Sequence, residues 1–157
     1  MLVILHNIRS VHNVGSIFRT SDAAGVNEIL LSGYTPTPLD RFNQPRKDFA
    51  KVSLGAEKTV PWKYVRTLGP TLKKLQKENY LLAAIEQDEK STPLFGWRPP
   101  SDRPLAVLVG NEVRGISKPL LKKCDVILEI PMRGKKESLN VSVTAGIALF
   151  TLTNKIK

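Results

Sequence analysis

Short apolar runs alternate with amphipathic stretches in the first part of the chain. Residues 1–6 (MLVILH) and 26–33 (VNEILLSG) predict two buried strands. The stretch between them predicts a helix with Ser10 or Asn13 as its N-cap and Gly25 at its end. The residues at helical spacing on its buried face are Val14, Ile17, Phe18 and Ser21. This strand–helix–strand order predicts a parallel pair joined by a right-handed crossover.

The middle of the chain has a less regular pattern. Residues 34–55 lack a clear period and contain three prolines, so we expect a long loop with at most one helical turn. Residues 57–65 fit a strand or a packed turn, 71–79 a short amphipathic helix and 80–86 a strand. The proline-rich stretch 91–104 fits a surface connection and not a domain boundary.

The last third returns to alternating elements. Residues 104–112 and 125–131 predict strands, 117–123 a short helix and 133–140 a basic loop. In residues 141–157, the Val, Thr and Ile content favours a strand, whereas the length and the lack of turn residues favour a helix, which we prefer. This helix is apolar almost all round and must be covered on several sides, which predicts a homodimer interface.

Together these elements predict an α/β fold in which a mostly parallel sheet is flanked by helices. The chain has 157 residues, and we expect them to form one domain, 1–157. Ligands of such sheets bind beyond the carboxyl ends of the strands.

The charge balance points to an anionic partner. Lys and Arg number 24 against 14 Asp and Glu, a formal net charge of +10. RNA, DNA and anionic membranes are the candidates, although a merely basic soluble protein would show the same balance. The single cysteine, Cys124, excludes an internal disulfide. The apolar start is too short for a signal peptide and no run reaches the roughly 18 residues of a membrane span, so we expect a cytoplasmic protein and no membrane partner.

Several common sites are excluded. The segment 110–117 (GNEVRGIS) begins like a phosphate-binding loop, but Ile116 stands where such a loop needs lysine. No GxGxxG motif occurs. The two histidines, His6 and His12, have no cysteine nearby, so we expect no metal site.

Three segments retain candidate chemistry. The first helix carries Asn13, Arg19 and Asp22, although the spacing of Arg19 and Asp22 equally fits an ordinary ion pair on a helix surface.

The other two segments follow predicted strands. One strand ends at Gly110, with Glu112 directly after it, which fits either close approach of a ligand or a plain turn. Ser138 and Asn140 precede the last helix, where they fit an anion site or a simple N-cap.

In this order, the three segments resemble the signature motifs of the SpoU (TrmH-like) family of SPOUT RNA 2′-O-methyltransferases, and the match extends from Asn7 to about Leu152. In the first motif the matching positions are Asn13, Gly15, Arg19, Thr20, Asp22 and Gly25. In the second they are Gly110, Glu112 and Gly115. In the third they are Ile130, Pro131, Met132, Ser138, Leu139, Asn140 and Ser142.

The resemblance implies a C-terminal trefoil knot at about 105–150 that holds S-adenosylmethionine, and a homodimer with its active sites at the interface. It implies transfer of the methyl group to a ribose 2′-OH of RNA. The implied cofactor-binding residues are Leu108, Val109, Gly110, Asn111, Glu112, Ile130, Met132, Ser138, Leu139 and Asn140.

The implied catalytic residues are Arg19, Asn13, Glu112, Ser138 and Asn140. Arg19 matches the family's proposed base, but a charged guanidinium accepts no proton, so we expect it to clamp an RNA phosphate and orient the ribose. Glu112 would accept from the ribose or orient Arg19. Ser138 and Asn140 would hold the hydroxyl or the cofactor carboxylate.

The partner implied by the resemblance is RNA, with tRNA ahead of ribosomal RNA, and we expect this domain to recognise it without a further RNA-binding domain. The expected RNA contacts are Arg9, Arg19, Arg41, Arg46, Lys47, Lys51, Arg114, Arg133, Lys135 and Lys136. The alternatives are a catalytically silent RNA-binding protein on the same fold and an unrelated nucleotide-binding α/β enzyme.

Overall fold

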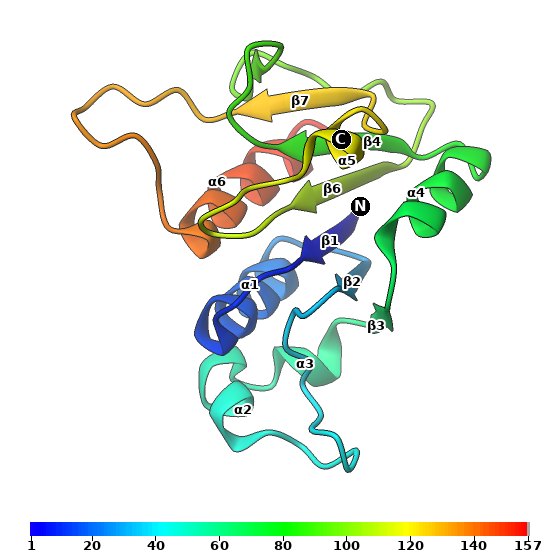
Figure 1. Cartoon of the computed structure of the whole chain (residues 1–157), viewed down its shortest axis with the longest axis vertical. Coiled ribbons are helices and arrows are strands. Elements are labelled where there is room, and N and C mark those ends of the chain that lie inside the picture. The colour runs from blue at the N-terminus through cyan, green and yellow to red at the C-terminus, as the bar shows by residue number, and fades with distance from the viewer. Residues whose placement is uncertain (157) are drawn as a thin grey trace.

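A computed structural model describes residues 1–156. Over these residues, seven strands form one sheet in the order β3-β2-β1-β6-β4-β7-β5, and every pair is parallel (Figure 1). The strands are β1 (Leu2–His6), β2 (Glu28–Ser32), β3 (Trp62–Val65), β4 (Leu81–Ile85), β5 (Thr92–Pro93), β6 (Leu105–Val109) and β7 (Val126–Glu129). The predicted α/β class with a parallel sheet is confirmed.

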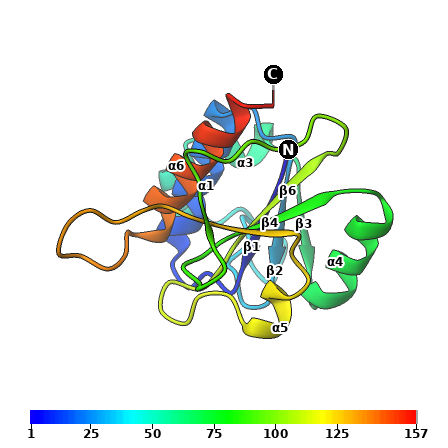
Figure 2. The same cartoon turned by 90° about the horizontal axis from the view of Figure 1, so that it is seen from above.

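Helices cover both faces of this sheet. They are α1 (Val11–Ala23), α2 (Lys47–Ser53), α3 (Ala56–Thr59), α4 (Leu68–Lys77), α5 (Lys118–Leu121) and α6 (Val141–Thr153). Helices α1 and α6 lie side by side on one face, and α4 and α5 lie on the other (Figure 2). The parallel pairing of β1 with β2 across α1 is the unit that the sequence predicted.

The two covered faces explain why the strands are apolar throughout. In β1, Val3 and Leu5 join the core cluster under α1 and α6, whereas Leu2 and Ile4 join the cluster under α4. Because side chains alternate along a strand, a strand buried on both faces needs an unbroken apolar run.

Strand register brings distant segments to one edge of the sheet. Strand β6 lies between β1 and β4, and Val109 is opposite both Leu5 and Ile85. On the far side of β4, Ile85 is opposite Leu128 of β7. The carboxyl ends of these four strands therefore meet at the same edge, and the segments that follow them surround it.

Three elements differ from the sequence predictions. Helix α2 makes about two turns where we expected a loop with at most one, because Phe49 and Ser53 are its only buried residues and give almost no periodic signal. Helix α4 begins at Leu68 and not at 71, since Pro70 fits a first helical turn. The short strand β5 lies within the predicted connection 91–104.

The final segment is the predicted helix α6. Ala145, Ala148 and Leu149 are fully buried, whereas Val143 and Phe150 are 48% and 46% exposed. None of the helices described over residues 1–156 has the length and apolar character to cross a bilayer. The trefoil knot stays a prediction.

Candidate functional site

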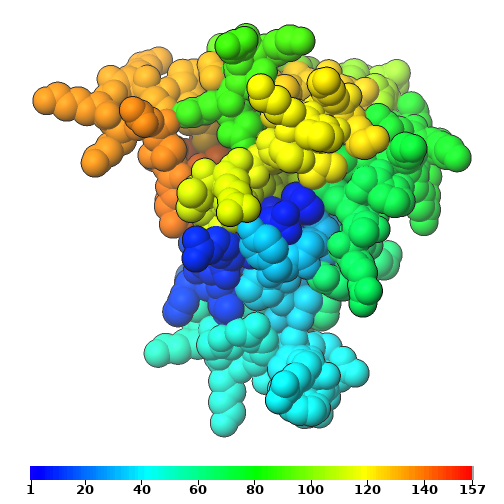
Figure 3. All heavy atoms as spheres, viewed as in Figure 1, coloured from blue at the N-terminus to red at the C-terminus, as the bar shows by residue number. Residues whose placement is uncertain are grey.

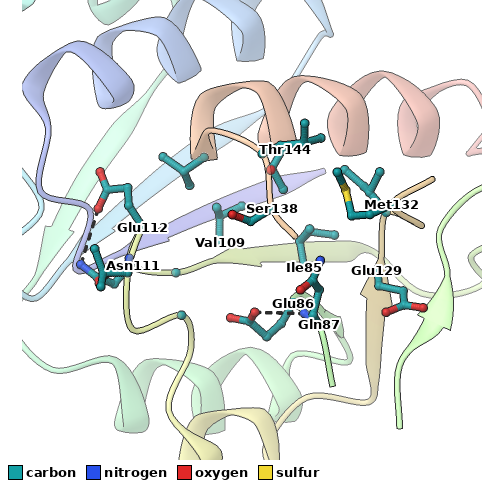
Figure 4. Close-up of a pocket in the computed structure, with 16 residues that line it drawn as sticks. Ile85, Glu86, Gln87, Val109, Asn111, Glu112, Glu129, Met132, Ser138 and Thr144 are labelled. Atoms are coloured by element: carbon teal, nitrogen blue, oxygen red, sulfur yellow. Dashed lines mark hydrogen bonds between the residues drawn. The ribbon is translucent and has the colours of Figure 1, made fainter. Parts of the chain in front are cut away.

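A pocket of about 260 Å³ lies at the carboxyl ends of β4, β6 and β7, below the start of α6 (Figure 4). Small-molecule sites typically measure about 300–1,000 Å³, so this cavity is slightly smaller than that range. The predicted cofactor residues that line it are Val109, Gly110, Asn111, Glu112, Ile130, Met132, Ser138 and Leu139. Asn140 and Leu108 do not line it. The side chain of Leu108 points to the opposite face of β6 and packs in the cluster under α4.

The pocket also contains residues that sequence analysis missed. Ile85, Glu86 and Gln87 line it from the end of β4, and Thr144 lines it from α6 (Figure 4). The strand at 80–86 was predicted, and its carboxyl end was therefore a candidate, but its position between β6 and β7 could not be predicted from the sequence.

Two glycines permit the tight loop after β6. A Cβ on Gly110 would collide with Cγ1 of Ile116 and lie 2.9 Å from the carbonyl carbon of Gly115. Gly115 has φ of +62°, and a Cβ there would meet the Glu86 carboxylate. That carboxylate accepts a hydrogen bond from the Ile116 backbone N–H at 2.8 Å. The loop thus folds back against the end of β4 and brings its backbone to the pocket wall.

Asn111 anchors this loop from within. Its side chain is 8% exposed, and Oδ1 accepts from the backbone N–H groups of Val113 and Arg114 at 2.9 and 2.7 Å. Its Nδ2 donates to the Asn7 carbonyl and to the Tyr34 hydroxyl, both at 2.9 Å. One buried amide therefore ties the loop after β6 to the segments after β1 and β2.

Glu112 holds the start of α1. Its carboxylate accepts from the Arg9 backbone N–H at 3.0 Å and from the Ser10 backbone N–H at 3.3 Å. It also accepts from Asn13 Nδ2 at 3.0 Å. Burial raises the pKa of the Glu112 carboxyl, but these hydrogen bonds outweigh burial and bring the pKa below its ordinary value. Asn111 Nδ2 also donates to this carboxylate at 3.5 Å, and within residues 1–156 no hydrogen bond or ion pair joins Glu112 to Arg19.

Asn140 is both the N-cap of α6 and a partner of Asn13. Its Oδ1 accepts from the Ser142 backbone N–H at 2.8 Å and from the Ser142 hydroxyl at 2.6 Å. Its Nδ2 donates to Asn13 Oδ1 at 3.2 Å. The three predicted motifs therefore meet in one chain of hydrogen bonds, Glu112–Asn13–Asn140, beside the pocket.

Arg19 lies apart from this cluster. It is exposed on α1, almost two turns beyond Asn13, at a shallow depression that Phe150 of α6 also lines. The ion pair with Asp22 that the spacing allowed is absent from residues 1–156; Asp22 accepts instead from the Thr59 hydroxyl at 2.6 Å. Within one protomer the structure does not bring Arg19 to the pocket.

The predicted RNA-binding cations are mostly exposed. The exposed ones are Arg9, Arg19, Arg41, Lys47, Lys51, Arg114, Arg133, Lys135 and Lys136. Arg46 is half-buried and pairs with Asp48 at 2.7 Å, so its charge is partly neutralised. The clusters at 41–51 and 133–136 lie at opposite ends of the face in Figure 3, in cyan and orange.

The single cysteine does not contribute reactive chemistry. Burial and the neighbouring Asp125 raise the pKa of the Cys124 thiol to about 12, so the thiolate is scarce at neutral pH. Within the described residues 1–156, no three His, Cys, Asp or Glu side chains gather as a metal site.

Known proteins are similar to this chain in sequence over most of its length. The chain is 35% identical over 150 residues to the 23S rRNA (guanosine-2′-O-)-methyltransferase RlmB of Ralstonia nicotianae, an alignment that covers 96% of this chain and 57% of RlmB. It is 34% identical over 149 residues to RlmB of Escherichia coli, covering 95% of this chain and 58% of that protein. The chain thus spans less than three fifths of these relatives.

Solved structures share the fold, and a family model covers almost the whole chain. An AdoMet-bound rRNA methyltransferase from Sinorhizobium meliloti superposes with a TM-score of 0.84 at 26% identity, covering 96% of this chain and 54% of that one. The TrmH/SpoU tRNA modifying enzyme of A. aeolicus gives 0.83 at 26%, covering 98% and 74%. The model of the SpoU rRNA Methylase family matches residues 1–150. The chain belongs to the SpoU rRNA methylase family.

Proposed function

We propose that this chain binds S-adenosylmethionine in the pocket at the strand ends and transfers its methyl group to a ribose 2′-OH of RNA. The observation that carries the proposal is the hydrogen-bonded chain Glu112–Asn13–Asn140 at the edge of that pocket. It joins all three family motifs at one place, beside a cavity that the second and third motifs line.

The pocket fits this cofactor chemically. Val109, Ile130 and Leu139 offer apolar contacts of the kind that an adenine ring and the methylene groups of a methionine chain need. Glu86 and Glu129 also line the pocket, and their negative charges would favour a ligand that carries both an ammonium and a sulfonium charge. The solved relative from S. meliloti, an AdoMet-bound rRNA methyltransferase, supports the same assignment.

The residues beside the pocket would orient the acceptor and not attack it. When bound, the cofactor supplies an electrophilic methyl group. Glu112 is a poor proton acceptor, since its lone pairs are occupied and its pKa is lowered, so its role is to hold Asn13. Asn13 and Asn140 then present fixed amide groups to a ribose hydroxyl, and the proton leaves to an RNA phosphate or water.

Arg19 would act across a homodimer. The apolar side chains of Val143 and Phe150 are half exposed on α6, and Arg19 lies on the same surface as Phe150. If this surface packs against a second copy, Arg19 lies at the interface, apart from its own pocket, and we assign it to the pocket of the partner. There its fork of donors would clamp the RNA phosphate next to the target ribose.

The acceptor is RNA, and we place tRNA ahead of ribosomal RNA. The tRNA modifying enzyme of A. aeolicus aligns over 74% of its chain, although the RlmB relatives act on 23S rRNA. The net charge of +10 supports a polyanionic substrate. We also propose a cytoplasmic location.

Two variants separate cofactor binding from transfer. Ser138→Trp fills the pocket and should abolish S-adenosylmethionine binding in calorimetry, whereas the exposed control Ser101→Trp should bind as the wild type does. Asn13→Ala should keep cofactor affinity within about threefold but lower methyl transfer to bulk RNA at least about 100-fold. A wild type that binds RNA but no cofactor would overturn the proposal and support the silent RNA-binding alternative.

A further inference from the structure

A second depression adjoins the pocket on the side of the β1 and β2 ends. Arg9, Tyr34, Asn111, Val113 and Arg114 line it, and Asn111 and Val113 also line the pocket. Asn111 and Val113 thus form a wall that the pocket and the depression share. A molecule that reaches the pocket from this side passes through the depression and along this wall.

Tyr34 forms an exposed but fixed aromatic surface in this depression. Its side chain is 57% exposed. The hydroxyl accepts from Asn111 Nδ2 at 2.9 Å, and the backbone N–H donates to Asn7 Oδ1 at 3.2 Å. Because Asn111 is itself buried and fully hydrogen-bonded, the ring is held in place before any ligand arrives.

Two arginines stand beside the ring, and the pocket edge positions both. The Arg9 backbone N–H is held by the Glu112 carboxylate, and the Arg114 backbone N–H by Asn111 Oδ1. Neither arginine takes part in an ion pair within residues 1–156, so both guanidinium groups face solvent with their donors free for an anion.

We propose that Tyr34 stacks on the unpaired base of the nucleotide whose ribose is methylated, while Arg9 and Arg114 bind its flanking phosphates. An aromatic face and two guanidinium groups in one depression match the base and phosphates of one nucleotide. The shared wall at Asn111 then places the ribose at the pocket mouth. This inference rests on the proposed function and deepens it: the acceptor is an unstacked nucleotide in a single-stranded segment and not in a duplex.

The binding test uses a fluorescent single-stranded RNA of about 20 nucleotides and the same RNA annealed to its complement. Tyr34→Ala should raise the Kd for the single strand about tenfold and leave the duplex Kd unchanged, because paired bases are not free to stack. Tyr34→Phe loses the same hydrogen bond to Asn111 but keeps the ring, so its loss of single-strand affinity should be much smaller than that of Tyr34→Ala. Phe95→Ala, at an aromatic residue of similar exposure, 55%, is the surface control.

Equal single-strand affinity for Tyr34→Ala and Tyr34→Phe would overturn the inference, as would an equal loss on both RNA forms. Arg9→Ala should weaken both forms alike and reduce the salt dependence of binding, since phosphate contacts carry no sequence information. These measurements need no cofactor. Failure of the wild type to methylate RNA would therefore contradict the proposed function alone, and an intact methylation rate in Tyr34→Ala would contradict the stacking role alone.

Discussion

The side-chain amide of Asn13 donates to the Glu112 carboxylate at 3.0 Å, across 99 positions of the chain. This one contact joins the first helix to the loop after β6, and through Asn140 it reaches the N-cap of α6. The carboxylate also holds two backbone N–H groups at the start of α1, so the loss of its charge affects both the fold and the site.

Glu112→Gln should lower both stability and activity. The new amide NH₂ would face the Arg9 N–H or the Asn13 amide, leaving one donor unpaired, and we expect a loss of about 1–2 kcal/mol in the free energy of unfolding. Methyl transfer should fall further than stability alone explains, because Asn13 loses its anchor. Chemical denaturation and a transfer assay measure the two effects. The exposed control Glu89→Gln should change neither, and wild-type transfer by Glu112→Gln would contradict the role of this contact.

Arg19→Ala and Asn140→Ala should each be inactive but should complement one another when mixed. If Arg19 serves the partner's pocket, a mixed dimer retains one intact site, and subunit exchange should restore about a quarter of wild-type activity. The measurement is transfer activity of the mixture after refolding together. Complete absence of recovery would place Arg19 in its own protomer's site, against its observed position on α1 beside Phe150.

A related substitution tests the geometry of the arginine. Arg19→Lys keeps the charge but loses the planar fork, so we expect transfer to fall at least about tenfold at saturating cofactor. If the pH–rate profile of this variant reaches the maximum transfer rate of the wild type, the bidentate fork is not required.

His6 should make the fold less stable in mild acid. Nε2 faces the Asn7 side-chain amide at 3.0 Å and Nδ1 faces the Ser32 hydroxyl at 2.8 Å, so Nε2 accepts in the neutral ring. Burial lowers the pKa of His6, so the unfolded chain binds more protons, and stability falls as the pH drops through about 6.5.

Thermal unfolding at about pH 7.5 and about pH 5.5 tests this dependence. His6→Gln should show a smaller difference between the two conditions than the wild type does. The control His12→Gln, at an exposed position on α1, should keep the wild-type difference. An unchanged pH dependence in His6→Gln would contradict the prediction.

Ser21→Ala should stabilise the chain. Ser21 is fully buried in α1, and its hydroxyl has no hydrogen-bond partner within the described residues. Removing an unpaired buried hydroxyl, together with the better helix propensity of alanine, should add roughly 1 kcal/mol to the free energy of unfolding. The matched control is Ser53→Ala, whose buried hydroxyl donates to the Phe49 carbonyl at 3.1 Å and whose loss should destabilise. A lowered unfolding midpoint for Ser21→Ala would show that its hydroxyl is paired in solution.

The sequence pattern predicted where the strands lie along the chain better than it predicted their order in the sheet. Apolar runs such as 1–6 and 80–86 are distinctive because both faces of the sheet are covered. Strand order depends on contacts between distant segments, so the place of β4 beside β6, and with it the role of Glu86 and Gln87, could not be predicted.

Sequence motifs predicted many of the residues that line the pocket but not the contacts that these residues make. From the sequence, Asn140 fits an N-cap and a functional residue equally well. In the structure its side-chain oxygen caps α6, and its amide NH₂ donates to Asn13. Leu108 was predicted in the cofactor set from its motif, although alternation along β6 turns it to the other face. Tyr34 carried no motif, and only the buried amide of Asn111 reveals its fixed position.

The most direct measurement is the chemical identity of the methylated product. The wild type is incubated with methyl-labelled S-adenosylmethionine and bulk tRNA or ribosomal RNA, and the RNA is digested to nucleosides for mass spectrometry. We predict label in a 2′-O-methylnucleoside, and none above background with Asn13→Ala. Label found only on a base would contradict the proposed reaction, and equal labelling by Asn13→Ala would contradict the proposed site.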